Sequence, residues 1–114
     1  HKMVKKNACV FISGYGSNLR SLIRNSRDKN FPVRISLVIS NKIDAKGILF
    51  AKLNSIPYLI INTKKRNFEN TIIKEIKKYK ISIICLAGYM KKLGSCMIKS
   101  FSGRILNVHP LLFP

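Results

Sequence analysis

Uninterrupted apolar runs alternate along the chain with segments whose apolar residues recur at helical spacing. Runs of this kind predict strands buried on both faces of a sheet. They lie at Ala8–Ile12, Val33–Ile39, Tyr58–Ile61, Ile81–Leu86 and Arg104–Val108. The helical segments lie at Asn18–Asn25, Ala45–Leu53, Asn67–Tyr79 and Ser95–Lys99. Their alternation predicts an α/β fold, a doubly wound, Rossmann-like parallel sheet with helices on both faces and right-handed crossovers.

Polar or glycine-rich segments lie at the carboxyl ends of four predicted strands. They are Gly14–Asn18, Ser40–Asn41, Ala87–Met90, and His109. In a doubly wound sheet, ligands bind outside the carboxyl ends of the strands. We therefore expect one composite site at that edge of the sheet.

Gly14 and Gly16 lie between the first predicted strand and the first predicted helix. The order of strand, glycine turn and helix start leaves backbone N–H groups free at a helix N-terminus, which suits a phosphate. Glycine permits close approach of the backbone, and Ser17 or Asn18 can cap the helix or bind the anion. A short glycine motif also fits a tight turn without a ligand, so both interpretations stay open on the motif alone.

Asn107 and His109 lie two residues apart at the carboxyl end of the last predicted strand, just before Pro110. Side chains at this spacing project from the same face of a strand. An amide donor and an imidazole side by side at the carboxyl end of a strand are typical of a catalytic pair. The alternative is a structural histidine before a proline turn.

The chain has 114 residues and a net charge of +18, which by charge alone suits a nucleic-acid binder. However, the basic residues are scattered, with no run longer than Lys64–Arg66 and no aromatic residues interleaved among them. The abundance of Ile, Lys and Asn, all with A/T-rich codons, explains much of the lysine excess. We therefore expect no nucleic-acid partner, and the charge favours attraction of anionic substrates.

Length and composition predict a single domain over residues 1–114, because 46% of the residues are hydrophobic and can form a core. No apolar run reaches the roughly 18 residues of a membrane span, and no signal peptide is recognisable. We expect a cytoplasmic protein without a membrane partner. Cys9, Cys85 and Cys96 lack metal-ligand spacing, so we expect structural cysteines and no metal. The sequence does not indicate an oligomeric state.

Four segments together resemble the phosphoribosylglycinamide formyltransferases, the folate-dependent enzymes of purine biosynthesis. They are ISGYGSNL at 12–19, SNKIDAKG at 40–47, LAGYMKKL at 86–93 and GRILNVHPLLFP at 103–114. The resemblance covers nearly the whole chain but only about the first half of the family. NVHP is shared with other formyl-folate enzymes, including methionyl-tRNA formyltransferase and formyltetrahydrofolate deformylase, whereas SGYGSNL singles out the glycinamide enzymes.

The resemblance implies transfer of a formyl group from the co-substrate 10-formyltetrahydrofolate to the amine of glycinamide ribonucleotide. It implies that Asn107 donates a hydrogen bond to the developing oxyanion, while His109 moves the proton of the amine. It also implies that Gly16, Ser17 and Asn18 bind the phosphate of glycinamide ribonucleotide. The residues implied in folate binding are Lys65, Met90, Lys91, Lys92, Leu93 and Asn107.

The sequence departs from the family pattern at several positions. Lys92 stands where the family tends to have an apolar residue, and Leu111 where a small polar residue is usual. Arg66 is adjacent to Lys65, so the sequence leaves open which of the two meets the carboxylate tail of the folate.

The family carries, beyond the part that this chain resembles, an aspartate that pairs with the catalytic histidine. We therefore expect residues 1–114 to be the N-terminal, nucleotide-binding part of such an enzyme, truncated and incomplete as a catalyst. Two alternatives stay open. One is another formyl-folate enzyme, such as the deformylase, which transfers the formyl group to water. The other is a vestigial domain that binds a nucleotide phosphate or nucleic acid without catalysis.

Overall fold

The computed structural model describes residues 5–12, 17–42, 46–87 and 105–107. Strands and helices alternate through these ranges, as the sequence predicts. In order they are β1 (Lys6–Ile12), α1 (Ser17–Ser26), β2 (Val33–Ser40), α2 (Lys46–Leu53), β3 (Tyr58–Ile60), α3 (Phe68–Lys78), β4 (Ile83–Ala87) and β5 (Ile105–Asn107). The helix expected at Ser95–Lys99 lies outside the described residues.

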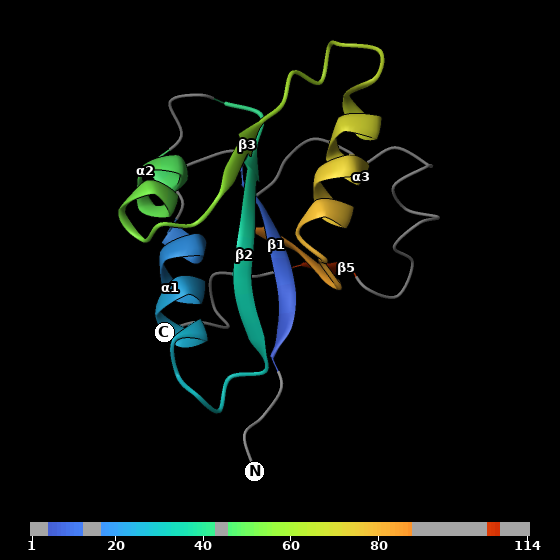
Figure 1. The fold of residues 1–114 in the computed structure, drawn as a ribbon. Helices are drawn as coiled ribbons and strands as arrows, with labels where there is room; N and C mark the ends of the chain where they lie inside the picture. The colour runs from blue at the N-terminus through green and yellow to red at the C-terminus, as the bar shows by residue number, and fades with distance from the viewer. Residues whose placement is uncertain (1–4, 13–16, 43–45, 88–104, 108–114) are drawn as a thin grey trace.

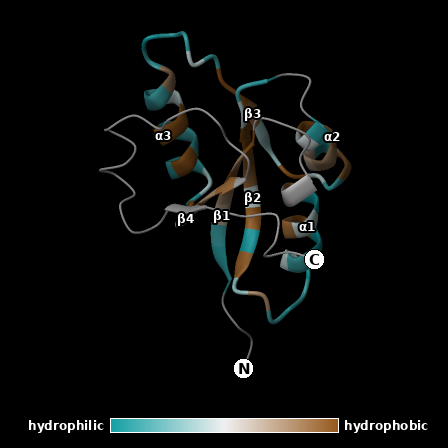
Figure 2. Ribbon diagram, turned by 180° about the vertical axis from the view of Figure 1, so that it is seen from behind, coloured by the Kyte–Doolittle hydropathy of each residue, from teal (hydrophilic) through white to brown (hydrophobic). Residues whose placement is uncertain are grey.

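The strands of the described residues form one parallel sheet in the order β3-β2-β1-β4-β5 (Figure 1). The chain winds outward from β1 through β2 to β3 and then returns to the other side of β1 as β4. Helices α1 and α2 cover one face, and α3 covers the other (Figures 1 and 2). The predicted fold class, a doubly wound sheet with helices on both faces, is therefore confirmed.

The central strand β1 divides the apolar core into two clusters, because successive side chains of a strand point to opposite faces. Ala8, Val10 and Ile12 pack in the cluster that α1 and α2 cover. Cys9 and Phe11 pack in the cluster that α3 covers. All five side chains are fully buried, so β1 is held rigidly from both sides.

Helices α2 and α3 both end with a non-glycine residue in the left-handed conformation. Ser55 and Lys80 each have φ of 55°. After α3, the N–H of Ile81 donates to the carbonyl of Ile76 (2.9 Å), and the N–H of Lys80 donates to Lys77 (3.2 Å). This pattern is a Schellman motif. It uses Ile81 to close the helix, which is why β4 begins at Ile83 and not at Ile81 as predicted.

Gly47 lets α2 approach the end of β1 closely. A Cβ atom built at this position would overlap Ile12 Cδ1 and would lie 3.2 Å from Leu19 Cδ2. Both neighbours are fully buried. The absence of a side chain at Gly47 therefore sets the spacing between α2, α1 and the carboxyl end of β1.

Candidate functional site

The carboxyl ends of the strands lie level at one edge of the sheet. Ile12, the last residue of β1, pairs with Ser40 at the end of β2 and with Ala87 at the end of β4. Asn107, the last residue of β5, pairs with Leu86 of β4. The predicted convergence of these strand ends is therefore confirmed for the backbone.

The winding of the sheet reverses between β1 and β4. After β1 the chain passes to α1 on one face, whereas β4 is reached from α3 on the other face. The crevice at such a switch point is the usual ligand site of an open α/β sheet. The predicted phosphate segment follows β1, and Asn107 ends β5 beside β4, so both predicted parts of the site flank this point.

Helix α1 begins at Ser17, one residue earlier than predicted, so Ser17 and Asn18 form its first residues. The first N–H groups of a helix lack partners within the helix and carry a partial positive charge. No acidic side chain lies in the first turn of α1, so no carboxylate of that turn competes for these donors. The start of α1 is therefore compatible with a bound anion, and the phosphate site stays a prediction. Gly16 lies outside the described residues.

The end of β2 carries the buried hydroxyl of Ser40, and the half-buried Asn41 follows it. Ser40 Oγ accepts a hydrogen bond from the N–H of Lys42 (3.0 Å) and donates to its carbonyl (2.9 Å). Asn41 Oδ1 is buried and has no hydrogen-bond partner among the described residues. A buried acceptor left unpaired at the edge where ligands bind is suited to a donor from a ligand. The sequence placed Asn41 at this edge but gave it no role.

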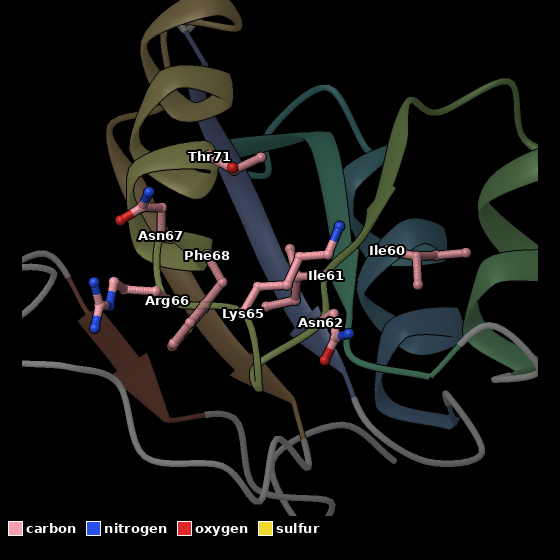
Figure 3. A pocket seen from close by; sticks show the side chains of 8 residues that line it. All are labelled: Ile60, Ile61, Asn62, Lys65, Arg66, Asn67, Phe68 and Thr71. Atoms are coloured by element: carbon pink, nitrogen blue, oxygen red, sulfur yellow. The ribbon is translucent and has the colours of Figure 1, made fainter.

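A cavity of about 340 Å³ lies between the end of β3 and the start of α3 (Figure 3). Its apolar side chains include Ile61 and Phe68, and its polar ones include Asn62, Lys65 and Arg66. The two basic side chains diverge in the view of Figure 3. Both line the cavity, so its geometry is compatible with either one as the partner of an anionic group.

The segment between β3 and α3 holds Lys65 at the cavity by a tight turn. Asn62 Oδ1 accepts from the N–H of Lys64 (3.0 Å), and the N–H of Lys65 donates to the carbonyl of Asn62 (3.0 Å). Asn67, the N-cap of α3, makes no capping hydrogen bond through its side chain. Cations and a helix start therefore face the same cavity, although Glu69 in the first turn of α3 adds an opposing charge.

Sequence reasoning identified Lys65 and Arg66 but missed the cavity residues Asn62 and Phe68. The signal was present, because Asn62 follows the carboxyl end of a predicted strand, as the other candidate residues do. Met90, Lys91, Lys92, Leu93 and His109 lie outside the described residues. Their roles stay predictions, as does that of the side chain of Asn107.

The two cysteines of the described residues lie in the core on adjacent strands, with free thiols. Burial raises the pKa of Cys9 well above its ordinary value, and the nearby Cys85 raises it further. Burial likewise raises the pKa of Cys85 to about 11. Both thiols are therefore protonated and unreactive near neutral pH, in agreement with the predicted structural role.

Among the described residues, no three His, Cys, Asp or Glu side chains are grouped closely enough to hold a metal ion. Within the same residues, no helix combines the length and apolar character needed to cross a membrane.

Comparisons with known proteins agree with this geometry. Residues 6–114 match the family described as formyl transferase. The phosphoribosylglycinamide formyltransferase of Bacillus subtilis is 33% identical over 113 residues, which are 96% of this chain and 58% of that protein. The human trifunctional purine biosynthetic protein adenosine-3 is 38% identical over 96% of this chain and 11% of its own length.

Solved structures give the same result. The crystal structure of phosphoribosylglycinamide formyltransferase from Brucella melitensis superimposes with a TM-score of 0.87 at 38% identity, covering 94% of this chain and 58% of that one. The chain thus spans little more than half the length of these single-function relatives. Since the family match extends over almost the whole sequence, this chain belongs to the formyl transferase family.

Proposed function

We propose that this chain is the nucleotide-binding part of a phosphoribosylglycinamide formyltransferase, which transfers the formyl group of 10-formyltetrahydrofolate to the amine of glycinamide ribonucleotide. The observation that carries the proposal is the switch point between β1 and β4. An N-terminal helix end free of acidic residues lies there, and the end of β5 lies one strand away. An anion site and a catalytic strand at one crevice are what a reaction on a phosphorylated amine requires.

In this proposal the phosphate of glycinamide ribonucleotide binds at the start of α1, to Gly16, Ser17 and Asn18. The amine then attacks the formyl carbon, and the carbonyl oxygen becomes an oxyanion that accepts a hydrogen bond from Asn107. His109 takes a proton from the attacking amine and delivers it to the folate nitrogen as the bond from that nitrogen to the formyl carbon breaks. The transfer is direct and needs no covalent enzyme intermediate.

The folate is assigned to the other end of the same edge. Its carboxylate tail pairs with Lys65 in the cavity between β3 and α3, with Arg66 as the neighbouring candidate. Its pteridine contacts the segment formed by Met90, Lys91, Lys92 and Leu93. Residues 1–114 form one domain in this proposal, and the walls that complete the folate pocket in relatives of full length come from their remaining half.

Activity assays of two forms of the protein test the proposal. The 114-residue chain alone is expected to transfer the formyl group poorly, because it lacks the aspartate that pairs with the catalytic histidine in the family. The loss of a positioned acid–base contribution is worth on the order of 10² to 10⁴ in rate. A fusion to the C-terminal half of the Brucella melitensis enzyme is expected to recover activity. In that fusion, His109→Ala should abolish transfer and Asn107→Ala should reduce it strongly, with glycinamide ribonucleotide still bound.

A matched pair of variants tests the folate tail. In the active fusion, Lys65→Gln is expected to raise KM for formyl-folate by up to about fivefold, the size of an exposed ion pair, with kcat unchanged. Arg66→Gln is the control and should change KM less.

Retained activity in His109→Ala would contradict the mechanism. Release of formate to water, with no dependence on glycinamide ribonucleotide, would identify a deformylase instead.

A further inference from the structure

A second cavity, of about 400 Å³, lies between α1 and α2. We name it the arginine groove, and its defining residues are Arg20, Arg24 and Arg27 on the side of α1, with Phe50, Leu53 and Asn54 on the side of α2. The two helices lie side by side on one face of the sheet in both ribbon views (Figures 1 and 2). None of these residues belongs to the site at the carboxyl edge.

The arginines of the groove lie along α1 and the turn that follows it. Arg20 and Arg24 are four residues apart on α1, and Arg27 lies in the turn just after the helix ends at Ser26, where its N–H donates to the carbonyl of Arg24 (3.3 Å). The chain contains sixteen lysines but only six arginines. Half of the arginines therefore gather in one groove, which a general excess of lysine does not explain.

The guanidinium groups have only neutral partners in the part of the chain that the structure describes. Arg20 lies over the ring of Phe50, 5.7 Å from its centroid, and Arg27 donates a hydrogen bond to Asn54 Oδ1. Arg24 is exposed. The chain has only four acidic residues, so a second copy of itself is a poor complement to three positive charges.

The α2 side of the groove is apolar and exposed. Leu53, which lines the groove, is 71% exposed, and Phe50 is half-buried. A nucleic-acid backbone would satisfy the arginines but offers no surface to bury leucine. A helix with carboxylates on one side and apolar residues on the other would satisfy both halves of the groove.

We propose that the arginine groove binds an acidic amphipathic segment of a partner protein. Its carboxylates, at helical spacing, pair with Arg20, Arg24 and Arg27, and an apolar side chain packs against Phe50 and Leu53. Arg guanidinium groups suit this task because their planar fork binds carboxylates in two-point fashion. The proposal does not depend on the formyl-transfer site.

Fluorescence anisotropy with a labelled synthetic peptide tests the proposal on the 114-residue chain. The probe is a helical peptide of about 16 residues with three glutamates at i, i+4, i+7 spacing and leucines on the adjoining face. Comparison probes carry glutamine for glutamate or serine for leucine, and an oligo(dT) probe represents nucleic acid. We expect saturable binding of the acidic amphipathic peptide at physiological salt and at least tenfold weaker binding of both altered peptides.

Variants of the chain localise the binding. Arg24→Gln is expected to lower the affinity for the acidic peptide by about fivefold, the size of one exposed ion pair. Leu53→Ser is expected to lower it by about tenfold through lost apolar contact. Arg34→Gln, which removes an exposed arginine of β2, is the matched control and should change affinity less than twofold. Thermal melting by circular dichroism should be unchanged in all three, because these side chains are exposed.

Four results would overturn the proposal. The first is equal binding of the glutamate and glutamine peptides, and the second is equal loss in Arg24→Gln and Arg34→Gln. The third is tighter binding of oligo(dT) than of the acidic peptide with the same dependence on Arg24, which would assign the groove to nucleic acid. Absence of any binding by the acidic peptide at millimolar concentration would also refute it.

Discussion

Replacing Gly47 by alanine tests how tightly α2 is held against the end of β1. The added Cβ would overlap Ile12 Cδ1 and would lie 3.2 Å from Leu19 Cδ2 and 3.4 Å from Ile12 Cγ1. Ile12 and Leu19 are both fully buried, so neither side chain can swing into solvent. Relief requires a shift of α2, or a strained rotamer at Ile12.

The expected magnitude follows from two opposing effects. Overpacking a dense core costs about 1–3 kcal/mol. Alanine gains up to about 1 kcal/mol over glycine within a helix, and less at Gly47, which is the second residue of α2. We therefore expect the free energy of unfolding to fall by about 1–2 kcal/mol, which lowers Tm by about 5 °C or more for a domain of this size.

Urea unfolding of four proteins measures the effect and its cause. They are the unmodified chain, Gly47→Ala, Ile12→Val and the double variant. Ile12→Val deletes the clashing Cδ1 atom and by itself costs about 0.5–1.5 kcal/mol. The double variant should therefore be less destabilised than the sum of the single variants. Strict additivity, or a stabilising Gly47→Ala, would refute the packing argument.

The remaining predictions concern the helix ends and a buried thiol. Ser55→Gly and Lys80→Gly should each raise the free energy of unfolding by about 1 kcal/mol in urea titrations, because glycine tolerates the left-handed conformation. Lys74→Gly, at an exposed position inside α3, should lower it by about 1 kcal/mol. Burial raises the pKa of Cys85 from 9.0 to about 11, so its stabilising contribution is present below pH 9 and is lost as the pH rises to 11. Between pH 9 and pH 11, the free energy of unfolding should fall less steeply in Cys85→Ala than in the unmodified chain. Equal slopes would show that ionisation of the Cys85 thiol does not cause the fall.

The core and the order of elements were predictable because they depend on the composition of short segments. The run from Ala8 to Ile12 is apolar at every position, and that is enough to specify a strand buried on both faces. Boundaries set by single backbone conformations were not predictable in this way. Lys80 adopts a left-handed conformation without being glycine, so nothing in its side chain indicates that the chain turns there before β4.

The location of the candidate site was predictable for a different reason. In a parallel sheet all carboxyl ends meet at one edge, so a correct order of strands and helices assigns Asn107 and the start of α1 to that edge. The cavity beside Lys65 was not predictable in the same way. It depends on the turn after Asn62, which is held by the hydrogen bond from the N–H of Lys64 to Asn62 Oδ1 and places Lys65 at the cavity. No periodic pattern in the sequence indicates such a turn.

Net charge alone does not distinguish the partners of this chain, but the position of each charge does. Among the described residues, the only buried polar or charged side chain is that of Ser40, so lysine can accumulate at exposed positions without disturbing the core. The groove between α1 and α2 is exposed, and its attraction for an acidic helix should weaken steeply with salt, because the screening length is about 8 Å at physiological ionic strength. In the proposed site, a phosphate at the start of α1 would contact backbone N–H groups directly, and such a contact depends less on long-range attraction. As salt is added, binding of the acidic peptide should therefore weaken before binding of the phosphate ligand does. Equal salt dependence would mean that both ligands bind through the diffuse charge of the surface.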